Sequence, residues 1–230
     1  MKKILLPLLI LLSLGLFGQN LQLHYDFGEN RQHFTSTLEM FKPDDFGATF
    51  WFVDIDYYDG VSANSASMAY WEIARYISLP FLKNSGPLSQ LTATVQYNDG
   101  LNSFGSFGRV WLGGVSYPID LKIVTVSTDV LVRKAENQDA SYQLTLIWFK
   151  PFFDGKLIFS GFCDLWGQTN ADFDADATDR QMVLLTEPQL WFNVSKNLAV
   201  GSEIEISKNF VYGAGDELKI NATLGLKWEF

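Results

Sequence analysis

The sequence predicts an all-β protein, an antiparallel transmembrane β-barrel of about 12 strands that occupies residues 19–230. Three observations predict this fold. Apolar and polar residues alternate with a period of two in many segments of the chain. The connections between these segments alternate between long and short. Before them comes an apolar N-terminal segment of the kind that directs export.

The first 18 residues are typical of a secretory signal peptide. Lys2 and Lys3 give it a basic start, and residues 4–17 are apolar almost throughout. Cleavage after Gly18 would leave Gln19 as the new N-terminus. The alternative is an uncleaved anchor helix, but 14 residues fall short of the roughly 20 that span a bilayer. We therefore expect an exported protein.

The period-two alternation is clearest, in chain order, in residues 21–27, 91–97, 198–206 and 218–230. In all, the sequence predicts twelve strands, at 19–27, 35–41, 47–57, 69–79, 89–97, 107–116, 121–133, 141–149, 156–166, 181–192, 198–206 and 217–230. They average about ten residues, which matches the 9–11 that a tilted strand needs to cross a membrane. An even number of strands is typical of bacterial single-chain barrels.

The connections carry independent information. Those after odd-numbered strands average nearly 10 residues, and those after even-numbered strands about 6. Three of the shorter ones contain a proline, Pro43, Pro118 or Pro151, which predicts tight turns there. Both chain ends then lie on the side of the short turns, as in outer-membrane barrels with periplasmic turns and longer outer loops. We therefore expect a monomer in the bacterial outer membrane, in contact with its lipid.

The competing interpretation is a secreted soluble β-sandwich or lipocalin-like barrel, which would also alternate. Aromatic pairs near strand ends, such as Trp148-Phe149 and Trp191-Phe192, favour the membrane barrel, because they suit interfacial girdles. The last strand also ends on Phe230. It resembles the C-terminal strand by which the barrel-assembly machinery recognises bacterial outer-membrane barrels, so that machinery is an expected partner.

The remaining composition limits the chemistry. A net charge of −9 argues against nucleic acid as a partner, because proteins that bind it are normally basic. Cys163 is the only cysteine, and His24 and His33 are the only histidines, so we expect no disulfide, no metal site and no cofactor. Neither Gly-x-Ser-x-Gly nor His-Glu-x-x-His occurs, and we expect no enzyme.

An acidic loop at 167–180 contains Asp172, Asp174 and Asp176. A calcium loop of the EF-hand type would need Gly and Glu at its sixth and twelfth positions, where this chain has Ala177 and Val183. The simpler interpretation is a solvated acidic loop, and the alternative is a loose contact with a divalent cation.

In a membrane barrel the polar parity faces the lumen. The residues predicted to face it are His24, Asp26, Glu39, Asp54, Asp56, Glu72, Gln96, Asp129, Asp164, Glu187, Glu203, Glu205, Lys219, Lys227 and Glu229. Acidic residues dominate, so an open channel would favour cations or neutral polar solutes. The alternative is an interior filled by a salt-bridged polar network.

Arg75 does not fit this pattern. It shares a parity with Trp71, Ile73 and Ile77 on the predicted lipid face, where Arg at mid-membrane costs about 2–4 kcal/mol. A β-bulge near Ala74 would turn it inward, and we predict one there.

Three segments resemble the nucleoside-specific channel-forming proteins of the Tsx type, which are twelve-stranded outer-membrane barrels, and their uncharacterised relatives. Residues 37–46 are similar to the family's Leu-Glu-x-x-x-Phe and Asp-Trp stretch. Residues 71–79 (Trp-Glu-Ile-Ala-Arg-Tyr-Ile-Ser-Leu) resemble its Met-Glu-Ile-Glu-Pro-Arg-Phe-Ser-Ile strand. Residues 159–167 resemble its Tyr-Ile-Gly-Phe-x-x-Phe-Asp-Trp-Gly segment. In the family the Glu and Arg lie four residues apart, whereas Glu72 and Arg75 lie three apart.

The resemblance implies passive diffusion of nucleosides through a narrow lumen, with aromatic rings stacking on bases and carboxylates binding ribose hydroxyls. It makes Glu39, Glu72 and Arg75 the leading candidates for ligand-binding lumen residues. Parity and proximity add Phe41, Asp54 and Tyr76.

The sequence thus predicts a channel for small polar solutes, with nucleosides as one candidate class. The alternative is a non-conducting barrel, plugged by its own side chains, with a structural or surface-binding role. A third hypothesis, a membrane-embedded hydrolase, would require a Ser or Thr near His24 at the barrel rim.

Overall fold

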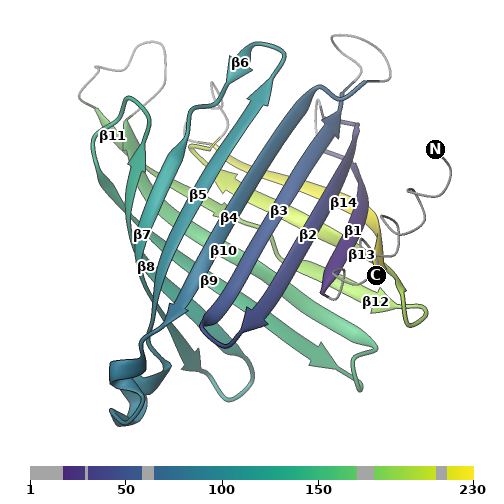
Figure 1. Ribbon diagram of the computed structural model, residues 1–230. Helices are drawn as coiled ribbons and strands as arrows, with labels where there is room; N and C mark the ends of the chain where they lie inside the picture. Colours follow the sequence, from purple (N-terminus) through teal and green to yellow (C-terminus); the bar gives the residue numbers. More distant parts are fainter. Residues whose placement is uncertain (1–17, 29–30, 59–64, 170–178, 211–216) are drawn as a thin grey trace, which may run out of the picture.

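The computed structural model describes residues 18–28, 31–58, 65–169, 179–210 and 217–230, and these form a closed antiparallel β-barrel (Figure 1). The predicted signal peptide, apart from Gly18, lies outside the described residues. The strands are β1 (Gln19–Asp26), β2 (Phe34–Asp44), β3 (Gly47–Tyr57), β4 (Met68–Ser78), β5 (Thr92–Asn102), β6 (Gly105–Ser106), β7 (Val110–Asp120), β8 (Thr125–Ala135), β9 (Ser141–Phe152), β10 (Leu157–Thr169), β11 (Arg180–Thr186), β12 (Gln189–Asn193), β13 (Leu198–Lys208) and β14 (Leu218–Glu229).

The wall of the barrel has twelve strands, as the sequence predicts. β6 pairs only with β5 and extends that hairpin beyond the rim. β11 and β12 lie end to end and together fill one place in the wall between β10 and β13. The first and last strands pair along seven residues, from Asn20 opposite Glu229 to Asp26 opposite Thr223, and so close the barrel. We call this β1–β14 contact the seam.

The two ends of the barrel differ in their connections. Both described chain ends and the connections 45–46, 79–91, 121–124, 153–156 and 194–197 lie at one end, which we call the turn end; the other is the loop end. The connection 79–91 departs from the expected short turn, since it carries the 3₁₀ helices η1 (Pro80–Leu82) and η2 (Gly86–Gln90), which protrude at the bottom of Figure 1. None of the helices in the described ranges has the length and apolarity that a membrane crossing requires.

The three prolines predicted in tight turns lie instead in the last residues of β2, β7 and β9. Each sits beyond the end of one neighbouring strand. Pro43 extends past β1, which pairs only as far as Met40, and Pro118 extends past β5, which pairs only as far as Ser116. Pro151 likewise extends past β8, whose pairing with β9 ends at Trp148. A residue without an N–H is tolerated there, because no hydrogen bond of the ladder is lost on the open side.

The single strand predicted at 181–192 is interrupted at Glu187 and Pro188. Opposite the break lies Gly161 on β10, with a φ of 148° that side chains rarely adopt. A Cβ atom at Gly161 would lie 2.4 Å from the carbonyl oxygen of Glu187. The interruption is therefore accommodated by this glycine, a role that alternation of polarity does not report.

The polarity of the wall is inverted relative to a soluble barrel. On β1 the side chains of Asn20, Gln22 and His24 are buried in the interior, whereas Leu21 and Leu23 are each 43% exposed on the outside. The same alternation continues on β14, where Leu224 and Leu226 face outward. An apolar exterior around a polar interior is the arrangement of a transmembrane barrel.

Candidate functional site in the barrel interior

Four of the six predicted lumen residues lie in the interior and are hydrogen-bonded there. Glu39 accepts a bond of 2.9 Å from the Nδ2 of Asn20, and Asp54 accepts one of 2.5 Å from the hydroxyl of Thr37. Those strands, β2 and β3, are neighbours, and the two carboxylates interact electrostatically.

The other two interior candidates lie on β4. The Glu72 carboxylate accepts hydrogen bonds from the Tyr70 hydroxyl at 2.5 Å and the Asn98 Nδ2 at 2.8 Å. The Tyr76 hydroxyl donates to the Oδ2 of Asp129 at 2.9 Å. The pairing of β4 with β5 places these groups on one stretch of wall.

Phe41 shares the inward parity of Glu39, but it lies near the turn end and is 54% exposed. It therefore stands at the mouth of the barrel rather than among the buried interior groups.

Arg75 does not face the lumen, and the predicted bulge near Ala74 is absent. The pairing of β3 with β4 continues without interruption from Thr49 opposite Arg75 to Phe50 opposite Ala74. Ala74 is the inward, buried residue. Arg75 instead donates to both carboxylate oxygens of Asp44, at 2.5 and 2.9 Å, near the turn end of the outer face. A carboxylate partner close to the rim removes the reason for turning the side chain inward.

On the seam side the interior forms a connected network. The ring nitrogens of His24 hydrogen-bond the hydroxyl of Thr223 and the side chain of Gln22, each at 2.9 Å. Gln22 in turn donates to Asn20 at 2.9 Å, and Asn20 donates to Glu39. The members of this network therefore lie on β1, on its neighbour β2, or on β14, which pairs with β1 across the seam.

Trp191 anchors this network from β12. It is completely buried, and its ring meets the ring of His24 edge-on, with centroids 5.5 Å apart. The ammonium of Lys227 lies 4.6 Å from its centroid, a cation–π distance. Gly201 and Gly225 make room for the indole, since a Cβ atom at Gly201 would approach it to 2.4 Å. The sequence predicts that Trp191 and Phe192 both belong to an interfacial aromatic girdle, but only Phe192 faces outward.

Arg31 ties the connection after β1 to the opposite side of the seam. Its Nε lies 2.8 Å from Asp26, and its Nη1 lies 2.7 Å from Glu205 on β13. Next to it in the same connection, the Asp56 carboxylate lies 3.5 Å from the Nε2 of His33 and raises the pKa of the imidazole. Arg31 lies outside any alternating segment, so periodicity could not have found it.

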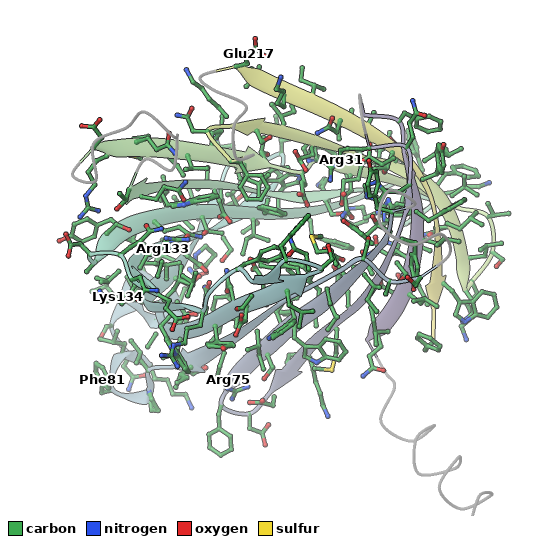
Figure 2. The ribbon with its side chains drawn as sticks, turned by 90° about the horizontal axis from the view of Figure 1, so that it is seen from above. Arg31, Arg75, Phe81, Arg133, Lys134 and Glu217 are labelled. Atoms are coloured by element: carbon green, nitrogen blue, oxygen red, sulfur yellow. The ribbon has the colours of Figure 1, made fainter. Side chains whose placement is uncertain are left out.

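The far wall, built from β4, β5, β8, β9 and β10, is less completely paired. Among the described residues, Asn98, Asp129 and Asp164 each keep one buried side-chain oxygen without a hydrogen-bond partner. Arg133, on the same inward parity of β8 as Asp129, lies over the ring of Trp166 at 5.4 Å and interacts electrostatically with Glu72 and Asp164. Its parity with Asp129 is the signal in the sequence that indicates this inward position. Figure 2 shows Arg133 and Arg31 on opposite sides of the barrel.

The interior is strongly acidic. Within the described ranges we count ten carboxylates against three cations: Asp26, Glu39, Asp54, Asp56, Glu72, Asp129, Asp164, Glu187, Glu203 and Glu205 against Arg31, Arg133 and Lys227. No group of three or more His, Cys, Asp or Glu side chains in this part of the chain is arranged to hold a metal ion. The Asp-rich segment at 172–176 lies outside the described residues.

A closed twelve-stranded barrel with an apolar exterior and a polar interior defines the class of transmembrane β-barrels, and solved structures of porins share the fold. A KdgM porin matches with a TM-score of 0.53 at 10% sequence identity, over 93% of this chain and 99% of its own. A NanC porin matches with a TM-score of 0.58 at 12% identity, over 92% of this chain and 100% of its own.

The chain belongs to the family described as "Domain of unknown function (DUF5020)", whose match spans residues 18–230. No curated protein matches the sequence. The resemblance to Tsx-type nucleoside channels finds no counterpart in the family match or in these two structures.

Proposed function

We propose that this protein is a bacterial outer-membrane channel for the passive diffusion of small polar solutes, and that it favours cations and neutral solutes over anions. The observation that carries the proposal is the excess of ten carboxylates over three cations on the inner wall. Rings of acidic side chains favour cation passage through a pore. The porin-like fold supports the channel, and we assign no catalytic step to the interior.

Nucleosides are the finer candidate for the solute. Tyr70, Tyr76 and Glu72 lie on one strand of the far wall and offer phenol rings beside a carboxylate. Stacking of a base on an aromatic ring is worth about 1–3 kcal/mol, which suits weak and reversible binding. Asn98, Asp129 and Asp164 keep free acceptor oxygens that ribose hydroxyls could use.

The proposal includes three further features. Residues 1–18 act as a signal peptide that is removed on export, the C-terminal strand with Phe230 is recognised by the barrel-assembly machinery, and the mature barrel is a monomer surrounded by outer-membrane lipid.

Single-channel recording of the refolded protein in a planar bilayer tests the channel. In a KCl gradient the reversal potential should show cation preference, and adenosine or thymidine should block current that glucose leaves unchanged. Cation-selective current that is indifferent to nucleosides would keep the channel and reject the nucleoside. A folded barrel without current would reject the channel and favour an interior closed by its own side chains.

A further inference from the structure

Six lysines gather at the turn end of the barrel: four lie on four of its five connections, and two lie near the ends of strands β2 and β9. They are Lys42, Lys83, Lys122, Lys150, Lys156 and Lys196, and we call them the lysine ring. No carboxylate lies within ion-pair distance of their ammonium groups among the described residues. Asp45, Asp120 and Asp154 occupy the same end without pairing with them, and Asp44 is bound to Arg75. The ring therefore presents unpaired positive charge.

At the loop end, three cations form ion pairs with carboxylates. Arg109 pairs with Glu136 at 3.4 Å, Arg180 with Asp139 at 3.2 Å, and Lys219 with Glu217 at 2.6 Å. Glu217 stands at the edge of the barrel in the view from above (Figure 2). Lys134 and Lys208 at the loop end also have no carboxylate partner among the described residues, so the contrast is two unpaired lysines there against six at the turn end. The larger number of unpaired lysines makes the turn end the one suited to an external anion.

Each of the five turn-end connections exposes an apolar side chain. The residues are Phe46, Phe81, Ile123, Phe153 and Val194, of which Phe153 is 78% exposed. Apolar groups beside lysines are typical of the boundary between acyl chains and headgroups, where the stem of a lysine lies in the apolar layer and its ammonium reaches the phosphates.

Two lysines show this arrangement directly. The ammonium of Lys156 lies 5.8 Å from the ring centroid of Phe192, an outward-facing residue of the wall. Lys150 lies 5.9 Å from the ring centroid of Phe152 in the same way. Both charges are thus held against the outer face of the barrel, at the rim of the apolar belt.

We propose that the lysine ring binds the phosphates of anionic phospholipids in the leaflet at the turn end. The lysines are distributed over four of the five connections and the ends of β2 and β9. This distribution fits a continuous annulus of lipid rather than one partner protein, which would need a localised patch. Positive side chains at a membrane surface attract anionic lipid within a Debye length. This inference does not depend on whether the barrel conducts.

Lipid retention by the full-length mature protein tests the proposal. Refolded in vesicles of phosphatidylcholine with 30% phosphatidylglycerol, the protein should retain phosphatidylglycerol at least threefold over its bulk share in native mass spectrometry. A triple variant, Lys122→Gln, Lys156→Gln and Lys196→Gln, should lose most of this enrichment. The matched control, Lys134→Gln, Lys208→Gln and Lys219→Gln, removes three charges from the loop end and should keep it.

Three results would overturn the proposal: no enrichment in the wild type, equal loss in both triple variants, or stronger retention of lipid A through the ring lysines than of phosphatidylglycerol. If the turn-end variant does not refold, the wild type at 50 and 500 mM salt gives the answer. Enrichment must fall at high salt, because the attraction between exposed charges and headgroups is screened.

Discussion

The two halves of the barrel interior are built from the same kinds of side chain but are used differently. At the seam, His24, Gln22, Asn20 and Glu39 form a continuous chain of hydrogen bonds, and Trp191 packs over it. Among the described residues, no buried side-chain atom on β1, β2, β12, β13 or β14 lacks a partner. On the far wall three inward carbonyl or carboxylate oxygens do lack one.

In the proposed channel, this difference separates the side chains that stabilise the barrel from those that contact a solute. A fully paired polar network rigidifies the structure that contains it, whereas free acceptor groups remain available to a passing solute. We therefore expect substitutions at the seam to change stability and substitutions on the far wall to change selectivity.

The largest effect is expected at Trp191. Replacement by Ala leaves a cavity bounded by Gly201 and Gly225 and removes the ring that His24 and Lys227 contact. By analogy with buried Trp elsewhere, the free energy of unfolding should fall by about 3–5 kcal/mol. Urea unfolding in detergent micelles, followed by the mobility difference between unheated and boiled samples, measures it. Trp111→Ala, on the outer face, is the control. An equal fall in the free energy of unfolding in this variant would show that Trp191 has no special role in stabilising the seam.

Arg31→Gln should have the next largest effect. It leaves Asp26 and Glu205 buried without their cation, and the loss of these charged hydrogen bonds should cost about 1–3 kcal/mol. Arg180→Gln breaks an exposed pair with Asp139 and should cost at most about 1 kcal/mol. The same urea titration compares the two variants. Similar losses of unfolding free energy would show that the contacts of Arg31 with Asp26 and Glu205 do not stabilise the barrel more than an exposed ion pair does.

His33 predicts a smaller, pH-dependent contribution. Its folded-state pKa is raised by the Asp56 carboxylate beside it, so this stabilisation is complete below the unfolded pKa of about 6.5 and is lost as the pH rises through the folded value. The free energy of unfolding should therefore fall slightly between pH 6 and pH 8, by less than about 1 kcal/mol. In the His33→Gln variant this pH dependence of the free energy of unfolding should disappear. If it is unchanged, other titrating groups cause it.

The smallest energetic effect is expected on the far wall. Glu72→Gln combined with Asp164→Asn removes two of the ten interior carboxylates and should lower the K⁺/Cl⁻ permeability ratio about twofold, which is less than 1 kcal/mol. Stability should change little. Glu217→Gln, at the loop end, should leave the permeability ratio unchanged. A large stability loss in the double variant would contradict the division between the two halves.

The sequence predicted the barrel, its twelve wall strands and the inward side of β2, β3 and β4, because period-two alternation reports directly which face a residue occupies. This is why Glu39, Asp54, Glu72 and Tyr76 were found. For Arg75 alternation indicated the correct, outer face, and only the predicted β-bulge was wrong, because that prediction assumed that a charge cannot remain on the outer face. Asp44, distant in sequence, makes that position acceptable.

Other features depend on contacts that no local pattern encodes. The break between β11 and β12 requires Gly161 on a neighbouring strand, and the tie from Arg31 requires Glu205 on β13. Strand ends were also displaced: the segments predicted at 89–97 and 107–116 are β5 (Thr92–Asn102) and β7 (Val110–Asp120). Barrel stagger fixes those ends by pairing with neighbours, rather than by composition.

The seam also has a kinetic consequence. Asn20 and Glu229, which face each other across it, are separated by roughly 200 residues of chain, whereas most other wall pairs belong to consecutive hairpins. Contacts between such distant segments form slowly, since the loop entropy is lost before the contact forms. The hydrogen bond of His24 to Thr223 can therefore exist only once the circle is complete, and it distinguishes the finished barrel from an open, curved sheet of the same hairpins.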